Sequence, residues 1–133
     1  MNKLKISILL MLYDAGEKGL TDKQIADRLD INKKGFKKLE TALSEMKQHN
    51  DIAYKKGMCW IKHPEQFFKA EVTRVTPKSG FIRQLGDMPV EYFVRGRDLM
   101  GSIPGDIVLA KQTAEADERF SAEAVVVSVL EAN

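Results

Sequence analysis

The sequence predicts an α+β protein of two small domains: a winged helix-turn-helix over residues 1–63 and a closed five-stranded β-barrel over residues 64–133. Apolar residues recur at spacings of three and four as far as Met46, the pattern of amphipathic helices. From Lys69 to Val127, apolar and polar residues alternate instead, the pattern of half-buried strands. The pattern changes near Pro64, which places the boundary between the two domains there.

The first half is expected to hold three helices and a hairpin. The first helix ends near Gly16, Thr21 caps the second, and Asn32 caps the third after a tight turn, as polar N-cap residues do. A hairpin over residues 52–62 then turns around Gly57. The residues expected to face inward are Leu4, Ile8, Leu9, Leu12 and Tyr13 in the first helix, Ile25, Ala26 and Leu29 in the second, and Phe36, Leu39, Leu43 and Met46 in the third.

Composition indicates a folded, soluble protein that is not disordered, with 44% hydrophobic and 30% charged residues among 133. No apolar run is long enough to span a bilayer, and no signal peptide is evident. The single Cys59 excludes an internal disulfide and suits a reducing cytosol, so a cytoplasmic location is expected. Charge is uneven: residues 1–63 hold 13 basic and 8 acidic side chains, whereas residues 64–133 hold 8 and 11.

In the second half, five short strands within about 60 residues and no helical periodicity predict a small closed barrel. Strand alternation sorts the side chains by face. Ala70, Val72 and Arg74 are expected on one face of the first strand. Ile82, Tyr92 and Val94 are expected to fill the barrel, and Phe81 and Phe93 to project outward from neighbouring strands. Phe67 and Phe68 are expected to pack the joint between the domains, and Thr113 to Arg119 to form an acidic loop.

Three consecutive segments carry a resemblance to a known family. Glu91-Tyr92-Phe93-Val94, Asp98-Leu99-Met100-Gly101-Ser102-Ile103 and Gly105-Asp106-Ile107-Val108 resemble the cold-shock-like OB-fold barrel of the ribonuclease II / ribonuclease R family. In that family a helix-turn-helix segment precedes the first such barrel, and residues 126–133 resemble the join before a second one. The resemblance implies a parent that hydrolyses RNA from its 3′ end, with Mg²⁺ held by clustered aspartates in a later catalytic domain.

The barrel surface is the leading candidate for binding single-stranded or structured RNA. An exposed aromatic ring flanked by cations can stack on a base while a charge meets the phosphate, and Phe81 and Phe93 match the base-stacking positions of the cold-shock pattern. Two aromatic positions of that pattern are Arg74 and Ser79 here, so weak, sequence-tolerant and salt-sensitive binding is expected. The predicted RNA-binding residues are Lys69, Arg74, Lys78, Phe81, Arg83, Phe93, Arg95 and Arg97.

The third helix carries a second basic surface. Lys33, Lys34, Lys37 and Lys38 lie about half a turn from its apolar stripe, and Lys55 and Lys56 lie in the hairpin. In a winged helix these residues would meet nucleic-acid phosphates. The face has no Arg, Asn or Gln with which to read bases, so general affinity is expected at most. A solvated helix face without any ligand remains the alternative.

No catalytic or metal-binding arrangement is evident. His49 and His63 are the only histidines, and neither zinc spacing nor a phosphate-binding loop motif occurs. This segment is therefore expected to be non-catalytic and without a cofactor of its own, and the family resemblance implies a catalytic nuclease domain in cis. The alternatives are a stand-alone winged-helix regulator that binds duplex DNA through an OB accessory module, and a protein-interaction module without affinity for nucleic acid. A further alternative for the barrel is that Phe81 and Phe93 are core residues. Oligomeric state is left open.

Overall fold

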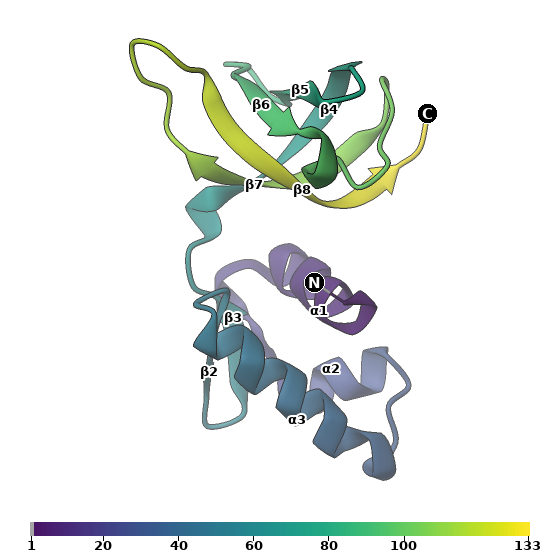
Figure 1. Cartoon of the computed structure of the whole chain (residues 1–133). Coiled ribbons are helices and arrows are strands. Elements are labelled where there is room, and N and C mark those ends of the chain that lie inside the picture. The colour runs from purple at the N-terminus through teal and green to yellow at the C-terminus, as the bar shows by residue number, and fades with distance from the viewer. Residues whose placement is uncertain (1) are drawn as a thin grey trace. The chain divides into compact units, whose positions relative to one another are not determined.

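The computed structural model describes residues 2–133, and its contacts divide the chain between Pro64 and Glu65 into two compact units (Figure 1). The first unit contains the helices and a small sheet, and the second contains a closed five-stranded barrel. The α+β fold class and the barrel are therefore as the sequence predicts.

Three α-helices form most of the first unit, and each begins at a polar cap. The Asn2 side chain accepts a hydrogen bond from the Lys5 N–H, and Asn32 accepts one from the Gly35 N–H. Thr21 and Gln24 form a reciprocal capping box, which satisfies two N–H groups that a helix start leaves without partners. The helices are α1 (Lys3–Ala15), α2 (Asp22–Arg28) and α3 (Lys33–Gln48), and a 3₁₀ turn, η1 (Gly16–Lys18), follows α1.

A three-stranded antiparallel sheet completes this unit. Its strands are β1 (Leu20–Thr21), β2 (Ile52–Lys55) and β3 (Met58–Ile61), in the order β1-β3-β2. The expected hairpin is confirmed. Lys56 and Gly57 form its turn with φ of 52° and 79°, and positive φ at both positions matches the twist of the paired strands. The order α1-β1-α2-α3-β2-β3 is what a winged helix requires. The assignment of this unit as a winged helix stays a prediction.

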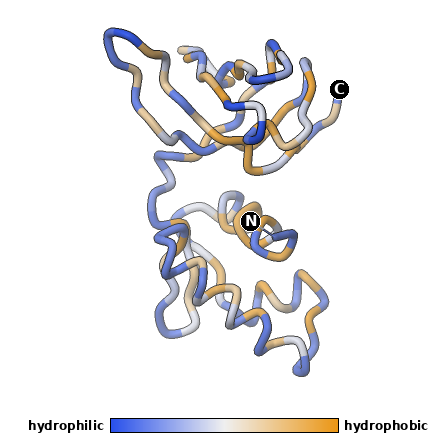
Figure 2. Tube along the Cα trace, in the orientation of Figure 1, coloured by the Kyte–Doolittle hydropathy of each residue, from blue (hydrophilic) through white to orange (hydrophobic). Residues whose placement is uncertain are grey.

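The apolar stripes of the helices form the core of the first unit, as expected. The buried residues are Ile8, Leu9 and Leu12 of α1, Ile25 of α2, and Leu39, Leu43 and Met46 of α3, while Phe36 is partly exposed. Figure 2 shows the alternation of apolar and polar segments that separates these faces. The burial of each large aliphatic side chain contributes about 1.5–3 kcal/mol.

The second unit is a barrel with one parallel strand pair. The strands close in the order β4-β5-β6-β8-β7, every neighbouring pair being antiparallel except β6 and β8. This is the architecture of an OB fold. The strands are β4 (Phe67–Val75), β5 (Ser79–Gln84), β6 (Glu91–Arg95), β7 (Ile107–Ala114) and β8 (Ala122–Glu131), with 3₁₀ turns η2 (Pro64–Gln66) and η3 (Gly96–Asp98).

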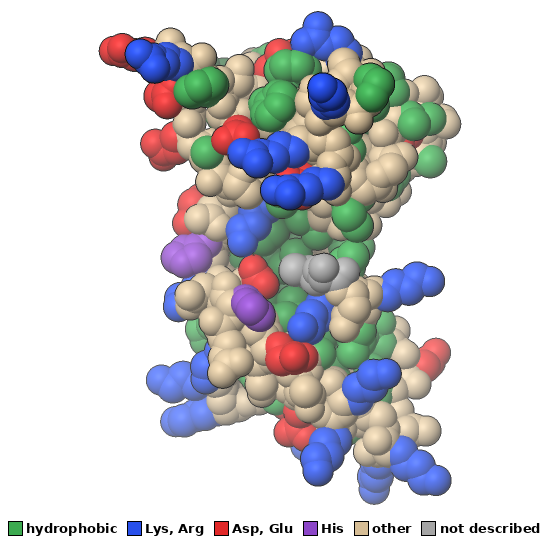
Figure 3. All heavy atoms as spheres, viewed as in Figure 1, with side chains coloured by type: hydrophobic (Ala, Val, Ile, Leu, Met, Phe, Trp, Pro, Cys, Tyr) green, Lys and Arg blue, Asp and Glu red, His purple; other side chains and the backbone are tan. Residues whose placement is uncertain are grey.

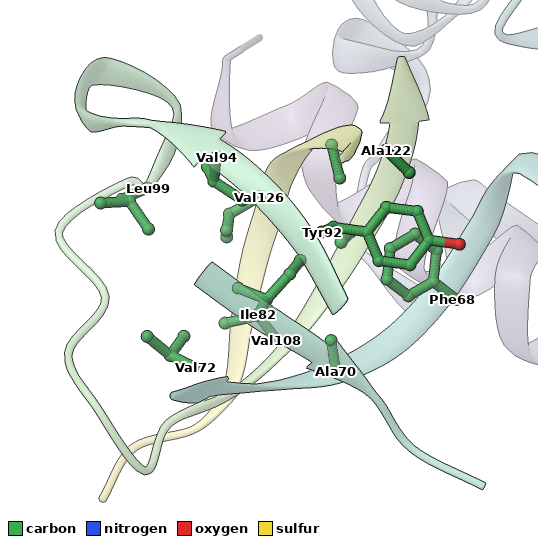
Figure 4. Close-up of a cluster of buried hydrophobic side chains, with 12 residues drawn as sticks. Phe68, Ala70, Val72, Ile82, Tyr92, Val94, Leu99, Val108, Ala122 and Val126 are labelled. Atoms are coloured by element: carbon green, nitrogen blue, oxygen red, sulfur yellow. The ribbon is translucent and has the colours of Figure 1, made fainter. Parts of the chain in front are cut away.

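The barrel interior is filled by one face of each strand (Figure 4). Ile82, Tyr92 and Val94 are buried there as predicted. The expectation for Phe68 is wrong: its ring belongs to this core and stacks on Tyr92 with centroids 4.4 Å apart. The reason is register, because Phe68 pairs with Ala110 of β7 and so begins the inward-facing row of β4.

Candidate nucleic-acid interface

A β-bulge in β4 brings Arg74 to the outer face of the barrel. Val72 pairs with Ile82, but Arg74 pairs with Phe81, so Thr73 is an extra residue in the strand. The Thr73 hydroxyl donates to the Phe81 carbonyl oxygen at 3.1 Å. The expectation that Arg74 shares a face with Ala70 and Val72 is therefore wrong, because an extra residue reverses the alternation beyond it.

Three side chains stand in a row across β4, β5 and β6 as a result. Arg74 is opposite Phe81, and Phe81 is opposite Phe93. The Arg74 guanidinium carbon lies 4.5 Å from the Phe81 ring centroid, within cation–π range. The two phenylalanine rings meet edge to face, with centroids 5.7 Å apart and planes at 69°.

Both rings are partly exposed and stand outside the buried cluster of the barrel. The alternative in which Phe81 and Phe93 are core residues is therefore excluded. They line an open hollow of about 580 Å³ on the barrel surface. The other lining residues come from β6, β8 and the loop before β8: Arg95, Arg119, Phe120, Ser121 and Glu123.

Phe120 is the aromatic residue of this surface that the sequence reasoning missed, and Arg119, Ser121 and Glu123 were missed as well. The Phe120 side chain is 69% exposed, on the loop that joins β7 to β8 and projects from the barrel (Figure 1). The loop spans residues 115–121, since β7 continues to Ala114, and the expected limits of Thr113 and Arg119 excluded Phe120. A lone aromatic among charged residues in a loop was the signal that could have revealed it.

The backbone of this loop is held by Asp117. One carboxylate oxygen accepts hydrogen bonds from the Arg119 and Phe120 N–H groups, both at 2.8 Å, and the Asp117 N–H donates to the Phe120 carbonyl at 3.0 Å. These bonds to the charged form hold the pKa of Asp117 below its usual range. Phe120 is thus presented to solvent by an ordered turn.

Acidic residues partly offset the cations of this face. The Arg95 Nε lies 3.7 Å from a carboxylate oxygen of Glu123, a spacing at which an exposed pair contributes little to stability. Arg83 projects next to Phe81 along β5, but it stands opposite Glu71 on one side and Glu91 on the other. Arg74 is therefore the cation held most directly over the aromatic pair.

The other predicted barrel cations lie at two ends of the strands. The Lys78 carbonyl accepts a hydrogen bond from the Gly96 N–H at 2.9 Å, which places Lys78 close to Arg95 and Arg97. All three side chains are exposed. Lys69 is exposed too, but its carbonyl bonds to the Leu85 N–H, at the opposite end of β4 from Arg74. The structure therefore does not bring Lys69 to the hollow.

The predicted basic surface of the first unit is solvent-exposed. Lys33, Lys34, Lys37 and Lys38 of α3, and Lys55 and Lys56 of the hairpin, all have exposed side chains. Figure 3 shows Lys and Arg side chains projecting from both units, with apolar side chains among them on the barrel.

Asp22 fixes the hairpin of this unit to the start of α2. Its N–H donates to the Gly57 carbonyl at 2.8 Å, and its carboxylate accepts from the Tyr54 hydroxyl at 2.9 Å. Burial is the main cause of the raised pKa of Tyr54, and this hydrogen bond is the second cause. The turn that carries Lys55 and Lys56 is therefore anchored on both sides.

Asp106, which follows Gly105, has a structural role. It is buried, and its two oxygens accept from the Asn133 N–H at 2.7 Å and the Ile103 N–H at 3.0 Å, which lowers its pKa. Over residues 2–133, no group of His, Cys, Asp and Glu side chains could hold a metal ion. No described helix is long and apolar enough to cross a membrane.

Neither protein-family models nor curated proteins give a match to this chain. Among solved structures, two of Mycoplasma genitalium RNase R match: the apo form, and the complex with ribose methylated single-stranded RNA. Each is 28% identical and covers 49% of this chain and 10% of the RNase R chain, with a TM-score of 0.44. The chain is thus similar to RNase R over about half its own length, and it spans about a tenth of the length of those proteins.

Proposed function

We propose that this chain is an RNA-binding region of a ribonuclease R-like exoribonuclease, and that the outer face of its barrel binds single-stranded RNA. The observation that carries the proposal is the row of Arg74, Phe81 and Phe93 beside the hollow. Partly exposed aromatic rings on neighbouring strands cost free energy in water unless a ligand covers them. Single-stranded nucleic acid supplies flat apolar bases for the rings and phosphates for the cations.

The cations suggest how a strand would run. Lys78, Arg95 and Arg97 gather at one end of β5 and β6, and Arg74 stands beside the rings. Phosphates placed along Arg74, Lys78 and Arg97 would leave their bases over Phe81 and Phe93, with Arg95 beside the base on Phe93. Cations of this kind do not select a sequence, and the affinity that they contribute falls as salt rises.

We propose further that the two units are the two expected domains, and that the first supports the second. The exposed lysines of α3 and of the anchored hairpin would add phosphate contacts to structured RNA. The activity that we propose for the full-length protein is hydrolysis of RNA from its 3′ end, with Mg²⁺ in a catalytic domain in cis. The motifs from Glu91 to Val108 support this assignment.

A gel-shift comparison tests the proposal against the alternatives. The chain is titrated into a short unstructured RNA and into duplex DNA of several sequences. We expect RNA to be shifted, with Phe81→Ala weakening the shift and the charge reversals Lys37→Glu and Lys38→Glu having a smaller effect. A preference for one duplex sequence that depends on α3 would instead support the transcriptional regulator. If neither nucleic acid binds, the protein-interaction module remains.

A further inference from the structure

Glu123 continues the row of outward-facing side chains beyond the aromatic pair. It is the residue opposite Phe93 in the parallel pairing of β6 and β8. The outer face therefore presents Arg74, Phe81, Phe93 and Glu123 in that order, a cation at one end and a carboxylate at the other. Glu123 also lines the hollow, and its side chain is 33% exposed.

A carboxylate at this position constrains how a nucleic acid can lie. It repels phosphates, so the sugar-phosphate backbone must run along the Arg74 side of the row. A base on Phe93 then points its hydrogen-bonding edge toward Glu123. An ionised carboxylate only accepts hydrogen bonds, so this edge has to supply N–H donors.

We propose that Glu123 and Arg95 form a base-reading pair that favours guanine in the hollow; this inference rests on the proposed RNA-binding function. Guanine presents two neighbouring N–H donors, N1–H and the 2-amino group, which a carboxylate accepts together, and its O6 accepts from a guanidinium. Adenine and cytosine each present one amino donor on that edge. Uracil presents one N–H between two carbonyl oxygens, which the carboxylate repels.

The arrangement of the pair fits this role. Arg95 Nε is 3.7 Å from Glu123 Oε1, so the two groups stand side by side and can meet adjacent positions on one base edge. Arg95 is 60% exposed and Glu123 33% exposed, so both can exchange part of their mutual contact for a ligand. The cations alone would make binding sequence-tolerant, whereas this pair makes one position selective.

The test uses uridine oligomers of equal length with a single guanosine, inosine or uridine at the centre. Inosine lacks the 2-amino group and so isolates one of the two donors. We expect the parent chain to bind the guanosine oligomer roughly fivefold or more tighter than the uridine oligomer, with inosine between them, since one bidentate contact discriminates at that level.

Glu123→Ala should abolish this preference while binding the uridine oligomer at least as tightly as the parent does. Glu118→Ala is the matched control, because Glu118 is an exposed acid of the adjoining loop between β7 and β8 and does not line the hollow. It makes the same change in charge and should keep the preference. Glu123→Gln keeps the size of the side chain and should also lose most of the preference.

Equal binding of all three oligomers by the parent, with affinity still dependent on Phe81 and Phe93, would overturn the guanine inference and leave the proposed function standing. A preference that persists in Glu123→Ala would overturn it in the same way. Absence of binding to any oligomer would overturn both proposals.

Discussion

Removal of the aromatic pair should weaken RNA binding without changing its dependence on salt. Phe81→Ala and Phe93→Ala each delete one ring of the outer face, and neither ring belongs to the buried cluster of the barrel. Stacking on an aromatic side chain contributes about 1–3 kcal/mol per base. Each substitution should therefore weaken affinity roughly five- to 150-fold, because 1.4 kcal/mol corresponds to a factor of ten.

The variant that carries both Phe81→Ala and Phe93→Ala should lose less binding free energy than the sum of the losses in the two single variants. The ring centroids are 5.7 Å apart, and side chains in contact show coupling of about 0.5–3 kcal/mol in double-mutant cycles. Either single substitution removes the neighbour against which the remaining ring packs, so part of the double loss is already present in each single variant.

Fluorescence anisotropy with a labelled unstructured RNA measures these losses between about 50 and about 200 mM salt. Arg74→Ala should reduce the salt slope by about 0.7, the value for one phosphate contact on a single strand, whereas the phenylalanine variants should leave the slope unchanged. Ile103→Ala is the control, since Ile103 is an exposed apolar residue that does not line the hollow. Unchanged affinity in both phenylalanine variants would refute the stacking site.

Three further predictions concern the scaffold. Gly80→Ala should destabilise the barrel by about 1–3 kcal/mol in urea unfolding, because its added Cβ would lie 2.8 Å from the Arg74 carbonyl oxygen; unchanged stability would contradict that contact. The Cys59 thiol should resist alkylation at pH 8 until the chain unfolds, because burial raises its pKa to about 12, and rapid modification of the folded chain would contradict this. Asp106→Asn should lower the stability of the folded chain at neutral pH, because the folded state depresses the pKa of Asp106 and is therefore stabilised by the ionised carboxylate. The difference in stability from the unsubstituted chain should shrink as pH falls below about 4, where the carboxylate becomes protonated. A stability difference that does not change with pH in acid would contradict this prediction.

Features that depend on local chemistry could be predicted from the sequence. Thr21 and Asn32 cap their helices because their side-chain oxygens reach N–H groups three residues ahead. Ile82 and Val94 fill the barrel because an uninterrupted strand alternates its faces. The outward direction of Phe81 and Phe93 follows from the same rule.

Features that depend on partners distant in the sequence could not be predicted from the sequence. Arg74 reaches the outer face through a bulge whose position is fixed by the pairing of β4 with β5. Phe68 enters the core because β7 sets its register. Glu123 comes to lie beside Phe93 only through the parallel pairing of β6 with β8, and no local pattern indicates that pairing.

An NMR titration of the isotopically labelled chain with a short single-stranded RNA tests the central claim most directly. We predict that chemical-shift changes concentrate on the amides and rings of Phe81, Phe93 and Phe120, and that they saturate with the same affinity as the anisotropy signal. Changes confined to α3 and the hairpin of the first unit, with the barrel face unaffected, would contradict the claim.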